Sequence, residues 1–426
     1  MRAAPHTRRP RRPRRVGAFT RKGAGAVAVP APNTQHGMRQ RNLSLVLHTV
    51  AAHGPISRAG VASRVGLTRA AVSTLVDELA RAGLLVELGR SRPGTVGRPG
   101  SDLALSERGP AGLGAEIGVD RLAVCAVDLR GRVRVRAEEA GGHRDSEPGP
   151  VLRRLAGLCA RVAADAEREG LRPVGVAVAV PGLVARDAAT VVRAPNLGWQ
   201  DLDAGAVLAD ALALPVTIAN EANIGALAEL WRGGRTPAPR DFVYVSAEIG
   251  IGAAVVVDGA LLRGAHGFAG ELGHVPVRPA GRPCACGGRG CLEQYAGEEA
   301  VLRAAGIEER GAAGVAVLRA RADAGDAEAR RALRGAGTAL GTALAGVVNL
   351  LDPETIVLGG ALTELSPWLL PAAERELRRH VADPTRAAHG EVVVSGLGRD
   401  AALLGAAQSV VQDVLDDPMG ALAAAG

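Results

Sequence analysis

The segments Gly267-Phe-Ala-Gly-Glu-Leu-Gly-His274 and Cys284-Ala-Cys-Gly-Gly-Arg-Gly-Cys-Leu-Glu293 lie close together in this chain of 426 residues. One histidine and three thiols at this spacing can bind a tetrahedral Zn²⁺ ion. The glycines between the thiols allow the tight turn that such a loop needs. Four protein ligands leave no open position on the metal, so we expect a structural zinc rather than a catalytic one. The predicted ligands are His274, Cys284, Cys286 and Cys291.

The chain has five cysteines, and the other two, Cys125 and Cys159, lie in apolar segments where we expect core packing. Thiols used in this way, without disulfides, are typical of a cytosolic protein. No apolar run approaches the ~20 residues that cross a bilayer, and the N-terminus lacks the apolar segment of a signal peptide. We therefore predict a cytoplasmic protein with no membrane partner.

Charge is unevenly spread along the chain, whose formal net charge is +7. Residues 1–38 carry +9 and residues 39–105 carry +5, which leaves −7 on the rest. A basic N-terminal part followed by an acidic remainder predicts a polyanionic partner for the N-terminal part. The first 38 residues are rich in Pro, Arg, Ala and Gly, which predicts a disordered basic arm, with a solubilising tail as the alternative. Met38 directly precedes the first helical pattern, and a start of translation there would exclude the arm.

Residues 39–105 have the pattern of a winged helix-turn-helix. An apolar face that recurs every three or four residues predicts a first helix that ends near Gly54. Ser57 then caps a short helix, Gly66 makes the turn, and Thr68 caps a longer helix. Double-stranded DNA is the partner that this architecture predicts.

Two sets of side chains in this region are predicted to contact DNA. The outward face at the start of the longer helix offers major-groove contacts from Arg69, Ser73 and Thr74. The wing, a loop at 89–100 between two short strands, carries Arg92 and Arg98, and the extended Gly-Arg-Pro-Gly around Arg98 fits a narrow minor groove. The alternatives are an ordinary polar helix face for the first set and a linker for the second.

From residue 106 the chain alternates between strand and helix patterns in two similar sets. The expected elements are strands at 113–118, 123–128, 174–180 and 216–219 with a helix at 151–169, then strands at 242–246, 253–257 and 355–358 with a helix at 332–351. A repeated set of mixed strands and crossover helices predicts two α/β lobes around a cleft. Periodicity alone does not name the fold.

In the histidine and cysteine motifs the chain resembles the ROK family, named for repressors, open reading frames and kinases. The resemblance extends from Met38 onward, because the repressors of that family carry a winged helix-turn-helix ahead of a sugar-kinase domain. It implies an α/β fold in two parts. The first is a winged helix-turn-helix over residues 39–105, and the second is a two-lobed, actin-like domain of the sugar kinase/Hsp70 type over residues 106–426.

The resemblance also implies a sugar site. The positions that hold sugar hydroxyls in the family match Asn220, Glu271, His274 and Glu293 of this chain. Carboxylates and an amide offer the hydrogen-bonding groups that neighbouring hydroxyls need. Asn196 is expected to line the same pocket, and His274 would place one ring nitrogen on zinc and the other on the sugar.

The positions that serve phosphoryl transfer differ from those of the family's kinases. Those kinases present Asp-x-Gly-Gly-Thr-Lys on the first strand, where this chain has Glu116-Ile-Gly-Val-Asp-Arg121. The second phosphate turn, at 249–252, lacks its usual hydroxyl residue and follows Glu248. The family's catalytic aspartate is Glu221 here, a degenerate base whose longer side chain shifts the carboxylate by roughly 1 Å, which can cost ~10²-fold in rate. We predict a sensor without catalytic residues, in which Glu221 contributes to sugar binding.

The sequence therefore predicts a sugar-responsive DNA-binding regulator, a repressor of carbohydrate uptake or catabolism genes. One helix-turn-helix reads only a half-site, so a homodimer or homotetramer is expected. One alternative is a DNA-binding enzyme that still phosphorylates a hexose with ATP. The other alternative is a constitutive DNA-binding protein in which residues 106–426 serve only for oligomerisation.

Overall fold

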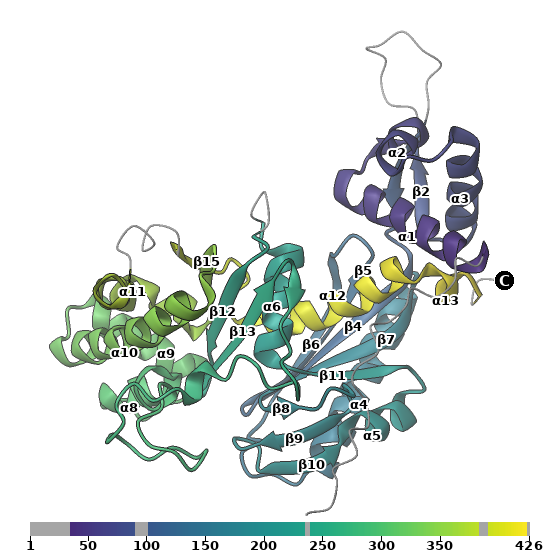
Figure 1. The fold of residues 1–426 in the computed structure, drawn as a ribbon. Coiled ribbons are helices and arrows are strands. Elements are labelled where there is room, and N and C mark those ends of the chain that lie inside the picture. Colours follow the sequence, from purple (N-terminus) through teal and green to yellow (C-terminus); the bar gives the residue numbers. More distant parts are fainter. Residues whose placement is uncertain (1–34, 90–100, 235–238, 383–390, 424–426) are drawn as a thin grey trace, which may run out of the picture.

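The computed structural model describes residues 35–89, 101–234, 239–382 and 391–423. These residues form a small N-terminal unit and two α/β lobes, with helix α12 (Ala401–Asp416) running from between the lobes to the N-terminal unit (Figure 1). The wing residues Arg92 and Arg98 lie outside the described ranges. None of the described helices is long and apolar enough to span a membrane.

The N-terminal unit is the predicted winged helix-turn-helix. Its elements are α1 (Gln35–His53), α2 (Arg58–Val65), α3 (Arg69–Arg81) and a sheet in the order β1-β3-β2 from Ile56–Ser57, Asp102–Leu105 and Leu85–Leu88. Both predicted caps are present, since Ser57 accepts from the amide of Gly60 at 3.1 Å and Thr68 from that of Ala71 at 3.2 Å. Gly66 adopts the left-handed conformation, with φ 70°, which the turn between α2 and α3 requires.

The first lobe is built on a five-stranded sheet in the order β11-β7-β4-β5-β6. Its strands are β4 (Gly109–Ile117), β5 (Arg121–Asp128), β6 (Val133–Ala140), β7 (Leu171–Val180) and β11 (Val216–Asn220). Helices α4 (Pro148–Arg168) and α5 (Ala204–Leu212) pack against it, beside a small sheet of β8 (Leu183–Val184), β9 (Thr190–Ala194) and β10 (Trp199–Asp203). Cys125 and Cys159 are buried in this lobe, and burial raises the pKa of both thiols to about 12, as expected of core cysteines.

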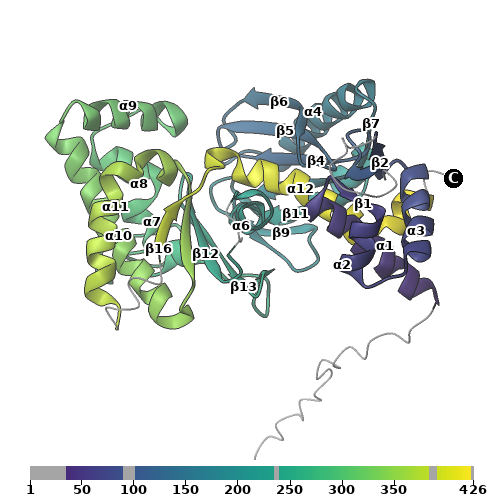
Figure 2. The ribbon, with the colours of Figure 1, turned by 90° about the horizontal axis from the view of Figure 1, so that it is seen from above.

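The second lobe repeats this topology, which confirms the predicted duplication. Its sheet has the order β14-β13-β12-β15-β16. The strands are β12 (Phe242–Ala247), β13 (Ile251–Val257), β14 (Ala260–Leu261), β15 (Thr355–Gly360) and β16 (Glu391–Val394). In both lobes the central strand pairs antiparallel with the next strand in sequence and parallel with a later one. Helices α8 (Glu298–Ala304), α9 (Gly311–Asp323), α10 (Ala327–Leu351) and α11 (Ala361–His380) complete the lobe (Figure 2).

Helix α12 packs against the first-lobe sheet with its backbone in direct contact. A Cβ at Gly112 would lie 2.2 Å from the carbonyl oxygen of Ala407, and one at Gly114 would lie 2.4 Å from the Ala407 nitrogen. A Cβ at Gly405 would lie 2.3 Å from the carbonyl oxygen of Ile224 in helix α6 (Glu221–Arg232). Interiors this dense have no room for added atoms, so β4, α6 and α12 form one rigid unit.

Candidate sugar cleft, zinc centre and DNA-binding face

A cleft of about 700 Å³ lies between the two lobes. First-lobe residues Glu116, Asn196 and Glu221 line it, together with second-lobe residues Glu248 and Glu298. The sequence assigned Asn196 and Glu221 to a sugar pocket, and both line the cleft. Asn220, Glu271, His274 and Glu293 are not among its lining residues.

Asn220 is the N-cap of α6. Its Oδ1 accepts hydrogen bonds from the amides of Ala222 and Asn223, each at 3.0 Å, and its Nδ2 donates to the carbonyl of Gly182 at 2.9 Å. Both acceptor sites of the side-chain oxygen are therefore used, and one N–H is left for a ligand. Asn220 positions Glu221, the first residue of α6, at the cleft.

Glu221 has no hydrogen bond or ion pair with any residue that the structure describes. Burial, followed by the nearby charges of Glu116 and Glu271, raises its pKa to about 7. Between pH 4.5 and 7 the folded chain thus keeps a proton that the unfolded chain has lost. Stability contributed by this proton is lost as pH rises through that window.

Glu221→Gln is expected to stabilise the protein at pH 8 and to have little effect at pH 5. The gain at pH 8 is on the order of 1 kcal/mol, since partial exposure and a lost favourable charge at the N-terminus of α6 reduce the effect of the pKa shift. Thermal unfolding at the two pH values measures it. Glu308→Gln, at an exposed glutamate of the second lobe, is the control and should give no such difference. An equal effect of Glu221→Gln at both pH values would contradict the assignment.

Glu271 precedes, and His274 ends, a single 3₁₀ turn, Leu272–His274, that packs tightly on β13. A Cβ at Gly273 in this turn would lie 2.2 Å from the carbonyl oxygen of Ile251. The His274 Nε2 lies 3.8 Å from the Glu271 carboxylate, and the His274 Nδ1 lies 3.9 Å from the carboxylate of Glu293. The two carboxylates therefore lie near opposite ring nitrogens, so the structure brings together three of the four residues that the resemblance assigned to sugar hydroxyls.

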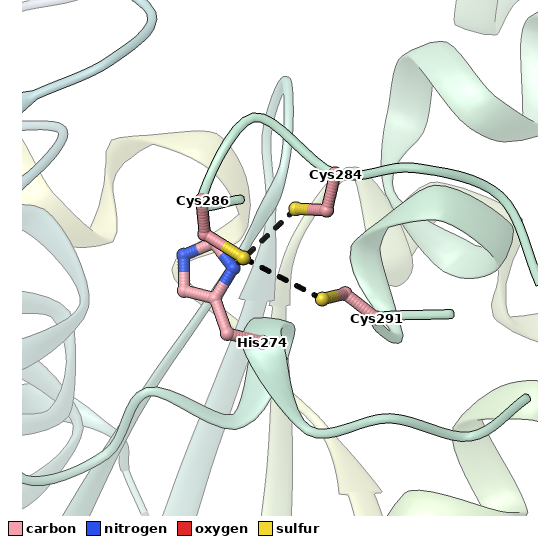
Figure 3. Close-up of side chains that lie close together, drawn as sticks. All are labelled: His274, Cys284, Cys286 and Cys291. Carbon is pink, nitrogen blue, oxygen red and sulfur yellow. Dashed lines mark hydrogen bonds between the residues drawn. The ribbon is translucent and has the colours of Figure 1, made fainter. Parts of the chain in front are cut away.

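The four predicted zinc ligands converge on one point (Figure 3). The ligand atoms of His274, Cys284, Cys286 and Cys291 all lie within 4.8 Å of one another. The Cys286 and Cys291 sulfurs are 3.7 Å apart, and the Cys284 sulfur is 3.7 Å from the His274 Nδ1. Zn–S bonds of about 2.3 Å in a tetrahedron place the ligand atoms roughly 3.8 Å apart, so this set fits zinc.

The residues at the former phosphate turns are tied to one another. Arg121 bonds the Glu116 carboxylate at 3.1 and 3.2 Å, and Arg399 bonds Glu248 at 3.0 Å and Glu298 at 2.9 Å. Burial raises the pKa of Glu116, Glu248 and Glu298, and the arginines oppose that shift. The two arginines at this place are already bound to carboxylates, so they offer little to a phosphate group.

Sequence reasoning missed the contribution of Arg399. Its partners Glu248 and Glu298 lie 151 and 101 residues away along the chain. No local pattern connects such positions, so only the fold could reveal the cluster.

Helix α3 presents the predicted major-groove face. Arg69 and Thr74 are exposed, and Ser73 is half-buried. The Thr74 hydroxyl donates to the carbonyl of Ala70 at 3.3 Å, which still leaves its oxygen free to accept. Arg58 is held by Asp77 and Glu87, each at 2.6 Å, so its charge is largely neutralised within the domain.

A winged helix joined to a sugar-kinase fold whose phosphate turns carry paired arginines and carboxylates is typical of a DNA-binding regulator. A model of the ROK family matches residues 112–413, and a model of the MarR family matches residues 41–94. A xylose repressor of Caldicellulosiruptor bescii is 31% identical over 398 residues, covering 89% of this chain and 98% of that protein.

Solved structures support the assignment to the ROK family. A ROK family transcriptional regulator, described as a homolog of the E. coli MLC protein, has a TM-score of 0.75 at 29% identity, covering 91% of this chain and 98% of its own. A ROK family glucokinase from Streptomyces griseus, in complex with glucose and AMPPNP, has a TM-score of 0.61 at 27% identity, covering 70% and 98%. The chain belongs to the ROK family, as a transcriptional regulator rather than one of its kinases.

Proposed function

We propose that the protein is a sugar-responsive repressor that binds operator DNA through its winged helix and a sugar through its interlobe cleft. One observation carries this proposal. Asn196 and Glu221 line the cleft, and so do the arginine–carboxylate pairs Arg121–Glu116 and Arg399–Glu248 at the former phosphate turns. A cleft that can hold a sugar but cannot position a phosphoryl donor suits sensing rather than turnover.

The sugar would be held by hydroxyl-binding groups near the cleft. The proposed contacts are Asn196, Asn220, Glu221, Glu271, His274 and Glu293. Asn220 would donate the one side-chain N–H that its bonds to Gly182 and to the start of α6 do not use. A structural zinc on His274, Cys284, Cys286 and Cys291 would fix the orientation of the His274 ring and so the geometry of this site.

The name of the Caldicellulosiruptor bescii relative suggests a neutral aldose as the effector. The cleft is lined by seven acidic residues and four arginines, and this excess of acidic groups favours a neutral ligand over a sugar phosphate. D-xylose is therefore the first sugar to test, with D-glucose beside it.

For DNA we propose contacts from Arg69, Ser73 and Thr74 on α3 and from Arg92 and Arg98 in the wing. A homodimer or homotetramer that acts in the cytoplasm would place two such units on an operator. We divide the chain into a basic arm at 1–38, a winged helix at 39–105 and a sugar-binding domain at 106–426. Helix α1 begins at Gln35, inside the proposed arm.

Selection of DNA by the full chain from randomised duplexes, followed by titration with each sugar, tests this function. We expect one selected sequence to bind with strong salt dependence, and one aldose to change its affinity by ~5- to 150-fold. Binding that discriminates between no DNA sequences, or DNA affinity that no sugar changes, would contradict the proposal.

Arg69→Ala is expected to weaken binding to the selected DNA by ~1 to 3 kcal/mol and to relax its base preference, because a lost bidentate contact to guanine affects one base pair. Fluorescence anisotropy with the selected DNA and single-base variants measures both effects. Arg81→Ala is the matched control, since Arg81 is an exposed arginine about 18 Å further along α3. Equal losses in the two variants would mean that α3 does not enter the groove as proposed.

A further inference from the structure

Arg399 is bound on one side by three carboxylates of the second lobe. Its Nη1 lies 3.0 Å from Glu248, its Nη2 lies 2.9 Å from Glu298, and its Nε lies 2.8 Å from Glu364. These partners come from the turn after β12, from α8 and from α11. The side chain is only 19% exposed. A planar guanidinium with three separate carboxylates is a fixed junction, because each donor edge has its own acceptor.

The same segment, at residues 399 and 400, is also bound by two arginines of the first lobe. The Arg399 carbonyl oxygen accepts from Arg121 of β5 at 3.4 Å. The next residue, Asp400, is bound by two nitrogens of Arg136 in β6 at 2.6 and 2.9 Å. Helix α12 follows directly and is locked to β4 and α6 by the glycine contacts described above. Residues 399 and 400 therefore link the two lobes, because the Arg399 side chain binds second-lobe carboxylates while the Arg399 carbonyl and the Asp400 carboxylate accept from first-lobe arginines.

The far end of α12 contacts the DNA-binding unit. Val411, Val414 and Leu415 share one apolar core with the buried face of α1. The ring of His48 in α1 lies 2.7 Å from the carboxylate of Asp416, the last residue of α12. One straight helix thus connects the Arg399 junction with the winged helix (Figure 1).

We propose that Arg399 is a positioning residue that couples the arrangement of the two lobes to the winged helix through α12. The inference rests on the proposed function, since it names how that function is regulated. Arg399, Glu248 and Glu298 all line the cleft, so a change in lobe separation either breaks this junction or moves the start of α12. Because α12 packs directly on β4 and α6 near its start and on α1 at its far end, such a movement is transmitted to the winged helix.

Operator DNA provides the test, because coupling between two sites is reciprocal. Hydrogen exchange is measured by mass spectrometry on the full chain, with and without the selected DNA duplex. In the wild type we expect DNA to protect α3 and also to change the exchange of cleft residues 248–252 by at least about fivefold, the lower end of allosteric coupling. In Arg399→Met, α3 should still be protected at a similar DNA affinity, while the change at 248–252 disappears.

Arg319→Met is the matched control. Arg319 lies 2.9 Å from the same Glu364, but it belongs to α9 and makes this contact within the second lobe. We expect this variant to respond like the wild type. Arg399→Lys keeps the charge but cannot bond three carboxylates in fixed directions, so DNA should have little effect on 248–252 in this variant. It replaces Arg399→Met in the test if the methionine variant does not fold.

The inference would be overturned if DNA still changed the exchange of 248–252 in Arg399→Met. If Arg399→Met is unfolded, the same result in Arg399→Lys would overturn it. So would a wild type whose α3 is protected while 248–252 do not change. Failure of the wild type to bind any DNA would instead refute the proposed function, so the two failures are distinct.

Discussion

Cys291→Ser is expected to remove the metal and to loosen the loop that contains its ligands. Cys291 pairs with Pro276 across this loop, and its sulfur lies 3.7 Å from that of Cys286. Binding of structural zinc contributes ~10 to 16 kcal/mol to folding of small zinc domains, so loss of one thiolate should leave this segment without its main restraint. Elemental analysis should show about one zinc per chain in the wild type and almost none in the variant.

The control for this result is Cys159→Ala, which also removes one thiol. Cys159 is buried in α4, in the core of the first lobe, so zinc content should stay at the wild-type level. Hydrogen exchange should accelerate at 276–292 in Cys291→Ser only. Freshly purified, unchelated wild type without zinc, or a serine variant that keeps its zinc, would contradict the assignment.

The winged helix could be predicted from sequence because its signals are local. Ser57 and Thr68 each bond an amide three residues away, and Gly66 supplies the one left-handed position between them. The convergence of the four candidate metal ligands was predictable for a related reason, since the three thiols lie within eight residues of sequence. A histidine ten residues before the first thiol completes the set. Short spacing limits the geometries that such residues can adopt.

The residue type of Asn220 was not enough to predict its hydrogen bonds. Its place in the family pattern predicts a contact with a sugar, but the structure commits most of its amide to the start of α6. A capping asparagine and a ligand-binding asparagine look identical in sequence, because both are followed by a helix. Only the path of the chain past Gly182 shows how much hydrogen-bonding capacity remains.

The altered phosphate turns show a different limit. The sequence identifies Asp120 and Glu248 as negative charges where phosphate would lie, and it predicts a regulator rather than a kinase, in agreement with the relatives. It does not show what these carboxylates bind, because Arg399 reaches Glu248 only when β16 and α12 bring the C-terminal segment back between the lobes. The altered phosphate turns could be recognised in the sequence, whereas the contact of Arg399 with Glu248 could be recognised only in the fold.

Glu271→Ala is expected to abolish the effect of the sugar on DNA binding while sparing zinc content and DNA binding without sugar. The Glu271 side chain is 42% exposed, and its carboxylate lies 3.8 Å from the His274 Nε2 and close enough to Glu221 to raise the pKa of Glu221. It makes no contact that the winged helix or the zinc thiols need among the described residues. A carboxylate that can accept from two neighbouring hydroxyls is replaced by a methyl group that accepts from none.

Calorimetry of D-xylose and D-glucose, with and without the selected operator, measures the effect of this substitution. In the wild type the effective sugar should bind ~5- to 150-fold differently in the two cases, and by reciprocity it should change operator affinity by the same factor. In Glu271→Ala both ratios should fall to about 1, because a ligand shifts an equilibrium only by its preference for one state. Glu308→Ala, at an exposed carboxylate of the same lobe, should keep the wild-type ratios. A wild type that binds sugar equally well with and without DNA would show that cleft and winged helix are uncoupled. An unchanged ratio in Glu271→Ala would remove this residue from the sugar site and leave the coupling itself intact.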